Sequence, residues 1–156
     1  MDRLIERLQK EGRLRKIPAG FMQVEALLRE AILDLQEARK TFKIAERATY
    51  IMAYNAMLKA GRALLLLNGW APDDGAQHRT IVEMTGAFLG EKYSHIANKF
   101  ESMRRKRNDM TYEAGVLISG KEKAQAFEDA IILVEGCLET AKKKNPQMKN
   151  RFQALN

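Results

Sequence analysis

The sequence predicts an all-α protein, an antiparallel bundle of four to five main helices preceded by a short N-terminal docking helix. The 156 residues are dominated by helix formers such as Ala, Leu, Glu, Lys, Arg and Met, and only three Pro and ten Gly interrupt them. Apolar residues recur at intervals of three and four, and no long stretch alternates like a β-strand. We expect one domain over residues 1–146 and a basic tail over residues 147–156.

Three helices are predicted in the first half of the chain. Residues 2–17 carry apolar side chains at helical spacing and form the docking helix, which Pro18 and Gly20 end. Residues 22–43 carry an apolar stripe opposite a charged face, so this helix needs a partner. Residues 45–68 are apolar around most of the helix circumference. We therefore expect this segment to be the central helix of the bundle.

Three further helices are predicted in the second half. Residues 77–89 form a short helix, and residues 91–117 form a longer one that contains a basic run. Ser119 and Glu122 have the spacing of a capping box, in which each side chain bonds the backbone amide of the other residue. The last helix therefore begins at this point, and it ends before Pro146.

Charge and apolar content exclude several classes of protein. The formal charge is +7, and basic clusters lie at residues 13–16, 104–107 and 142–144. Such clusters attract phosphate, with plain solvated helix faces as the alternative. The single cysteine, Cys137, excludes an intramolecular disulfide and indicates a reducing compartment. Charged residues near the N-terminus argue against a signal peptide, and the longest apolar run, residues 63–67, cannot span a membrane, so we expect a cytoplasmic protein without membrane contact.

Metal and cofactor sites have no support in the sequence. The two histidines, His78 and His95, lie seventeen residues apart with no cysteine or carboxylate at metal-ligand spacing. Glycine-rich phosphate loops, nucleophile elbows and dinucleotide fingerprints are absent. We expect no metal and no cofactor.

A basic motif in the second half of the chain points to function. It reads Arg107-Asn108-Asp109-Met110-Thr111-Tyr112 and directly follows Arg104, Arg105 and Lys106. Its form is an arginine, a polar residue, three further residues and an ionisable side chain. A guanidinium can clamp a phosphate through two hydrogen bonds, so the arginine of this motif is the natural anion ligand.

Together with other segments, this motif resembles the HEPN domains, small helical bundles of prokaryotic toxin–antitoxin modules and of eukaryotic nucleotide-binding regions. Their signature is Arg, four to six residues, and His. Residues 54–64 are similar to the second long helix of that family, and His78 follows the next loop, where HEPN domains commonly have a histidine. Residues 8–14 and 27–38 are similar to members that are encoded beside a nucleotidyltransferase.

The resemblance implies a cleft between two subunits, in which the motif Arg and His of catalytic members cleave RNA without metal. By position, Arg107 is the phosphate clamp and Asn108 its polar neighbour, whereas Tyr112 stands where the His belongs. A phenol with a pKa of about 10 is a poor general base at neutral pH, so we expect weak catalysis or none. Positions five apart on a helix differ by about 140°, so Arg107 and Tyr112 share a site only if Arg107 reaches around the helix or a second subunit closes it. The expected nucleotide or RNA contacts are Arg104, Arg105, Lys106, Arg107, Asn108, Tyr112 and His78, with Arg107 and Tyr112 as the degenerate catalytic pair.

Three functions remain open from the sequence. The first is a homodimeric module that binds nucleotide or RNA phosphate, with little or no catalysis, in a toxin–antitoxin-like pair with a nucleotidyltransferase. The second is a metal-independent endoribonuclease toxin in which Tyr112, or His78 from another helix, supplies the acid–base group. The third is a structural interaction module, with residues 104–107 solvated and Tyr112 packed at a helix interface.

Overall fold

The secondary structure is almost entirely helical in the computed structural model, which describes residues 1–73, 75 and 77–152. In chain order the elements are α1 (Asp2–Lys10), β1 (Leu14–Lys16), α2 (Phe21–Thr41), α3 (Glu46–Leu67), β2 (Trp70–Pro72), α4 (Gln77–Leu89), the 3₁₀ turn η1 (Glu91–Tyr93), α5 (Ser94–Tyr112), α6 (Gly120–Lys144) and η2 (Pro146–Asn150). The prediction of an all-α helical bundle is confirmed. None of the helices in these ranges combines the length and the apolar content needed to cross a membrane.

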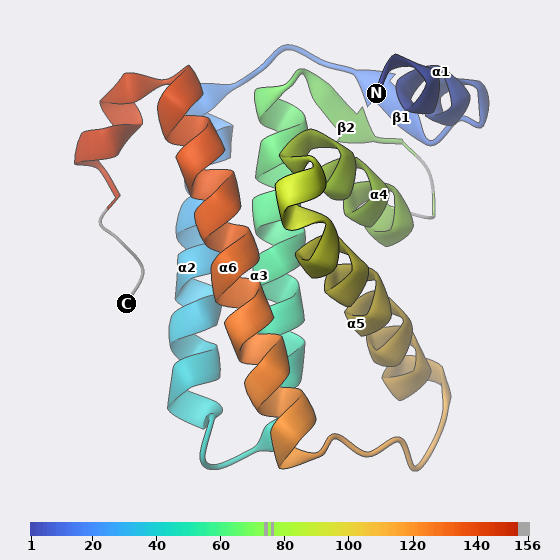
Figure 1. Cartoon of the computed structure of the whole chain (residues 1–156), viewed down its shortest axis with the longest axis vertical. Coiled ribbons are helices and arrows are strands. Elements are labelled where there is room, and N and C mark those ends of the chain that lie inside the picture. Colours follow the sequence, from blue (N-terminus) through green and yellow to red (C-terminus); the bar gives the residue numbers. More distant parts are fainter. Residues whose placement is uncertain (74, 76, 153–156) are drawn as a thin grey trace.

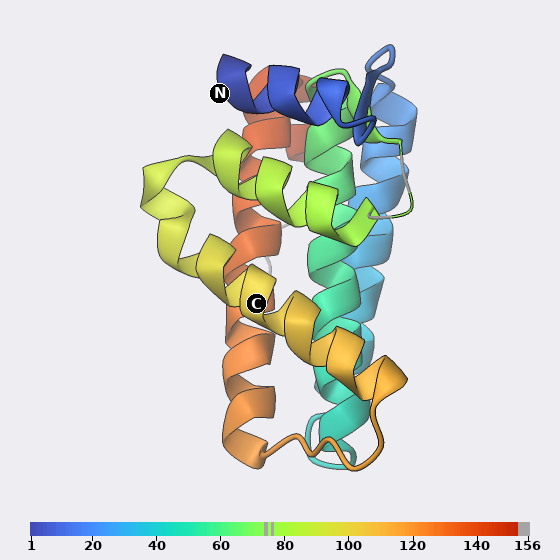
Figure 2. The same ribbon diagram turned by 90° about the vertical axis from the view of Figure 1, so that its right-hand side faces the viewer.

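Three long helices, α2, α3 and α6, stand side by side, and α4 and α5 lie along one side of them (Figure 1). Helix α2 runs opposite to α3 and α6, which run in the same direction. Helices α3 and α6 can run in the same direction because α4 and α5 lie between them in the chain. Helix α5 crosses the bundle obliquely and returns the chain to the end at which α3 begins (Figure 2).

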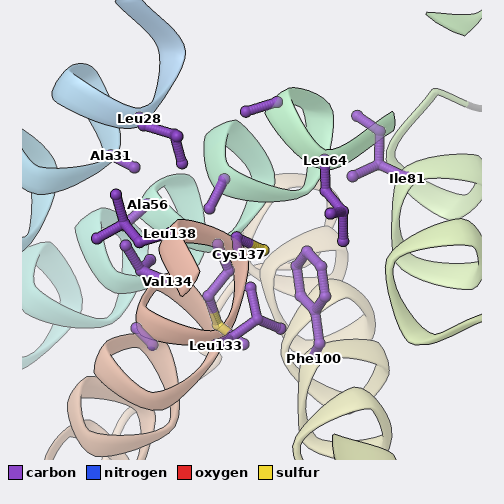
Figure 3. Close-up of a cluster of buried hydrophobic side chains, with 14 of the residues drawn as sticks. Leu28, Ala31, Ala56, Leu64, Ile81, Phe100, Leu133, Val134, Cys137 and Leu138 are labelled. Carbon is purple, nitrogen blue, oxygen red and sulfur yellow. The ribbon is translucent and has the colours of Figure 1, made fainter. Parts of the chain in front are cut away.

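Helix α3 is the centre of the bundle, as its apolar circumference predicts. Residues Ala53 to Leu67 are buried except for one partly exposed face made by Asn55, Leu58, Lys59 and Arg62. Figure 3 shows side chains from α2, α4, α5 and α6 converging on it, among them Leu28, Ile81, Phe100 and Leu133. The core thus contains one side chain or more from each of the five long helices.

Helix α6 begins at the predicted capping box. The Ser119 hydroxyl accepts a hydrogen bond from the Glu122 amide at 3.0 Å, and the Ser119 amide donates one to the Glu122 carboxylate at 3.2 Å. Two of the amides that a helix N-terminus leaves without an intrahelical partner are satisfied in this way. The predicted start of α6 is therefore confirmed, and the helix ends at Lys144, directly before Asn145 and Pro146.

Two predicted helices are shorter in the structure than in the prediction. Helix α1 ends at Lys10 rather than at residue 17, because Gly12 takes a positive φ of 71° and Leu14 then enters a two-stranded antiparallel sheet opposite Pro72. Leu14, whose spacing favoured a longer helix, is thus buried as a strand residue. Helix α5 ends at Tyr112 rather than at residue 117, and Gly115 follows with a φ of 81°.

Residues 147–152 of the expected basic tail pack against the bundle. Met148 is 1% exposed and Phe152 6% exposed, and both belong to the core. The Arg151 guanidinium also lies 2.7 Å from the Glu25 carboxylate of α2. Apolar burial and this ion pair hold the segment against the bundle. Residues 153–156 of the predicted tail lie outside the described residues.

Helices α3 and α4 approach each other closely at Gly61. A Cβ atom at this position would lie 2.5 Å from Thr85 Oγ1 and 2.8 Å from Ile81 Cγ2. We predict that Gly61→Ala lowers the free energy of unfolding by about 1–2 kcal/mol, because overpacking outweighs the gain in helix propensity. Urea unfolding measures this change. Gly120→Ala is the matched control, since a Cβ there meets nothing within 4 Å; equal unfolding midpoints for the two variants would contradict the close approach.

Candidate functional site

Three of the four cations in the basic run of α5 are held by carboxylates. Arg104 binds Glu101 with two nitrogens, Nη2 to Oε1 at 2.6 Å and Nε to Oε2 at 3.0 Å. Arg105 Nε lies 3.1 Å from the same carboxylate. Lys106 Nζ reaches across to Glu122 of α6 at 3.1 Å. These three cations therefore each have a carboxylate partner, although Arg104 and Arg105 share that of Glu101.

Arg107 differs from its three neighbours in the run. Its side chain is half-buried, and within the described part of the chain no carboxylate forms an ion pair with it. Asn108, the next residue, is exposed. Arg107 is thus the cation of the run that is available to a ligand.

Tyr112 is the last residue of α5 and is 78% exposed. Its hydroxyl makes no hydrogen bond to any residue in the described ranges. The alternative in which Tyr112 packs between helices is therefore wrong. The ring of Tyr112 lies in solvent at the end of the helix that carries Arg107.

His78, near the start of α4, is anchored by a tyrosine of α3. Its Nδ1 lies 3.1 Å from the hydroxyl of Tyr54, and the two ring centroids are 5.8 Å apart. Tyr54 is fully buried and packs edge-on against Phe100 of α5 at 5.9 Å. Burial raises the pKa of Tyr54, so its hydroxyl stays protonated. We infer that this phenol donates to Nδ1 of a neutral imidazole, whose own proton is then on Nε2.

Positive charge from two helices acts on His78. Burial lowers the pKa of its imidazole, and the charges of Arg107, Arg62 and Arg104 lower it further. Arg62 projects from α3 and donates a hydrogen bond from Nη2 to Gln77 Oε1 at 3.2 Å. A bound anion would reduce the repulsion between these cations, and a guanidinium can donate two parallel hydrogen bonds to a phosphate. The arrangement is therefore suited to bind an anion.

Sequence reasoning identified Arg107 and His78 but missed Tyr54, Arg62 and Glu101. Arg62 left a signal in the sequence, since it is the charged residue within the otherwise apolar run of residues 60–67. Tyr54 left none, because a tyrosine in an apolar helix is most simply read as core. The site combines residues of α3, α4 and α5.

The basic cluster at residues 13–16 has a structural role at Arg13. This guanidinium is buried, donates to Thr80 Oγ1 at 3.1 Å, and pairs with Glu83 at 3.2 Å and Glu11 at 3.1 Å. It therefore ties the segment before β1 to α4. Among the described residues, no group of His, Cys, Asp and Glu side chains has the arrangement of a metal site.

The fold and the site define a class of protein, a helical bundle whose fifth helix carries an arginine motif and whose fourth carries a histidine that is influenced by its charge. A family model of the HEPN domain matches residues 24–144. The chain belongs to the HEPN domain family, a nucleotide- and RNA-related group of helical domains. The matched span contains Tyr54, Arg62, His78 and Arg107. A search of curated proteins finds no match.

The charge of Arg107 should be measurable at His78. We predict that Arg107→Ala raises the pKa of the His78 imidazole toward its ordinary value, because one of the cations that disfavour the protonated ring is removed. A ¹H–¹³C NMR titration follows the ring directly, with His78→Gln for assignment. Arg105→Ala is the control, because it also removes one positive charge from α5. Arg105 is not among the cations that lower the pKa of His78. Equal shifts in the two variants would show that Arg107 has no special proximity to His78.

Proposed function

We propose that this chain binds the phosphates of RNA or of a nucleotide at Arg107, with little or no catalysis. We further propose that it acts as a homodimer in a toxin–antitoxin-like pair with a nucleotidyltransferase. One observation carries the binding proposal: Arg107 has no carboxylate partner among the described residues, although Glu101 and Glu122 pair with the three cations that precede it. Membership of the HEPN family supports the ligand class.

The neighbours of Arg107 have distinct roles in this proposal. Arg107 donates hydrogen bonds to a phosphate oxygen, which is the charge-assisted contact that guanidinium groups make best. Arg62 and Arg104 add long-range attraction, and Glu101 holds Arg104 in place through its two short contacts. A bound phosphate favours the protonated form of His78, so the imidazole becomes a further donor. Tyr54 fixes the orientation of that ring.

Tyr112 enters the proposal through a second protomer. It is exposed at the end of α5, about 140° around the helix from Arg107, so one protomer does not bring the two side chains together. A twofold axis near this end of α5 would place the Tyr112 of each protomer beside the cations of the other. There the phenol can donate a hydrogen bond to phosphate or stack on a base, but it is a poor general base at neutral pH.

The second candidate function is a metal-independent endoribonuclease with His78 as the acid–base group. Two features of His78 favour it. Its lowered pKa keeps the imidazole neutral near pH 7, and Arg107 is among the charges that act on it. General acid–base catalysis requires a side chain that exchanges protons near the working pH, and a phosphate clamped by Arg107 would lie within the influence of such a group.

Binding to RNA should be driven by phosphate contacts. We predict that the affinity for a fluorescent single-stranded oligonucleotide falls steeply with salt, and that Arg107→Ala weakens it by roughly tenfold or more, the usual cost of a charge-assisted hydrogen bond. Fluorescence anisotropy across a salt series gives both values. Arg105→Ala is the charge-matched control. The same loss in both variants would mean that only the general charge of α5 matters, and a flat salt dependence would exclude a phosphate site.

Cleavage separates the two candidate functions. We predict that the wild-type protein is nearly inactive as a ribonuclease and that Tyr112→His gains metal-independent cleavage. An imidazole that moves protons near pH 7 is typically worth about 10²- to 10⁴-fold. Arg107→Ala in the Tyr112→His background should abolish the gain.

The contrary outcome is equally specific. Strong cleavage by the wild type in the presence of a chelator, lost in His78→Gln and retained in Tyr112→Phe, would establish the nuclease with His78 as its acid–base group. His95→Gln is the matched control for removal of an imidazole, because His95 is exposed at the start of α5.

A further inference from the structure

A second surface lies at the other edge of the bundle, between the end of α2 and the first half of α6. These two segments are neighbours at the end of the bundle where the α2–α3 turn lies (Figure 1). A cavity of about 690 Å³ opens between them, and we call it the α2–α6 groove. Its apolar lining is Phe42, Ile44, Ala124, Phe127 and Ile131. None of the residues of the Arg107 site lines it.

The floor of the groove is apolar and well supported. The rings of Phe42 and Phe127 pack against each other with centroids 5.5 Å apart. Lys123 is buried, with its Nζ 3.9 Å from the Phe42 centroid, and it donates a hydrogen bond to the Phe42 carbonyl at 2.6 Å. Ile44, in contrast, is 81% exposed at the mouth. A large aliphatic side chain in water beside a preformed apolar floor is typical of an interaction site.

The rim of the groove is strongly basic. Arg39, Lys40, Lys43 and Lys121 line it, against the single carboxylate of Glu128. Lys40 lies 3.6 Å from Glu37, whereas in the described ranges Lys43 and Lys121 form no ion pair. An occupant that brings carboxylates to this rim would therefore meet uncompensated positive charge.

We propose that the α2–α6 groove binds an acidic amphipathic helix of a partner protein. Residues 121–131 of α6 extend over about 15 Å at 1.5 Å per residue, which matches roughly three turns of a docked helix. In this mode an apolar stripe at positions i, i+3, i+4 and i+7 enters the groove, and the flanking residues face the rim. Acidic flanking residues pair with Lys43 and Lys121. This proposal is independent of the function proposed for Arg107.

The lining favours a protein helix over RNA. Bases bind by stacking on open aromatic faces, but one face of the Phe42 ring is occupied by Lys123 and the Phe127 ring has the Arg39 guanidinium at 5.9 Å. The remaining apolar lining is aliphatic, namely Ile44, Ala124 and Ile131. Leucine and isoleucine side chains of a helix match such a floor better than nucleobases do.

A peptide display selection tests the proposal. Helical peptides with apolar residues fixed at the four stripe positions and random residues elsewhere are selected against the full chain, and enriched peptides are measured by fluorescence anisotropy. We expect an excess of Asp and Glu in the enriched sequences. Ile44→Asp, and separately the Lys43→Glu and Lys121→Glu double variant, should each weaken binding at least about tenfold.

Matched controls use exposed residues outside the groove. Leu33→Asp changes an aliphatic residue of α2 that is 55% exposed, and Lys149→Glu reverses an exposed charge. Both should leave peptide binding unchanged. Enriched sequences without an acidic excess, or peptide binding that Ile44→Asp leaves intact, would overturn the proposal.

The same variants are also measured with the RNA oligonucleotide. We expect the groove variants to retain RNA binding and Arg107→Ala to retain peptide binding. If the lysine double variant loses RNA affinity as strongly as Arg107→Ala does, the groove is part of an RNA surface and the proposed helix partner is wrong. If RNA binds to no variant and not to the wild type, the phosphate proposal fails and the peptide result still decides the groove.

Discussion

Burial of α3 around most of its circumference is the constraint on which the rest of the structure depends. A helix with an apolar stripe needs one partner, but a helix that is apolar around its circumference must be enclosed. Helices α2 and α6 cover two sides of α3, and α4 and α5 pack against a third, as Figures 1 and 2 show from two directions. The close approach at Gly61 is part of this enclosure, since a side chain there would push α4 away.

The candidate site follows from the same enclosure. Because α4 and α5 both lie against α3, the start of α4 and the basic run of α5 come near the same stretch of the central helix. Tyr54 of α3 is buried by this packing, and its hydroxyl needs a partner that the apolar core does not supply. His78 satisfies it. The imidazole is thereby held within the influence of Arg62 and Arg107, although these residues are far apart in the sequence.

The sequence predicted the features that depend on local pattern. The central helix, the capping box at Ser119 and the start of α4 at Gln77 follow from periodicity and turn chemistry within a few residues. Strand β1 was missed because its partner, β2, is distant in the chain, and apolar spacing alone does not distinguish a strand residue such as Leu14 from a helical one. The burial of Met148 and Phe152 was not predicted either, because it too depends on packing between distant parts of the chain.

The limit is similar for the site. Arg107 was identified from a motif, and His78 from its position after a loop. The position of Arg107 and His78 relative to Arg62 and Tyr54 depends on how α5 crosses α3. No short segment of the sequence determines that crossing. The exposure of Tyr112 likewise depends on where α5 ends, and Gly115 with its positive φ sets that end more directly than the apolar pattern does.

The ends of the chain show that the family match and the hydrophobic core have different boundaries. The match covers residues 24–144, yet Leu8 and Leu14 before it, and Met148 and Phe152 after it, are buried in the same core. A chain trimmed to the matched span would leave the apolar surfaces beneath these four side chains facing water. The family match marks residues 24–144, whereas the segments before and after that span lie at the same end of the bundle (Figure 1) and complete its core there.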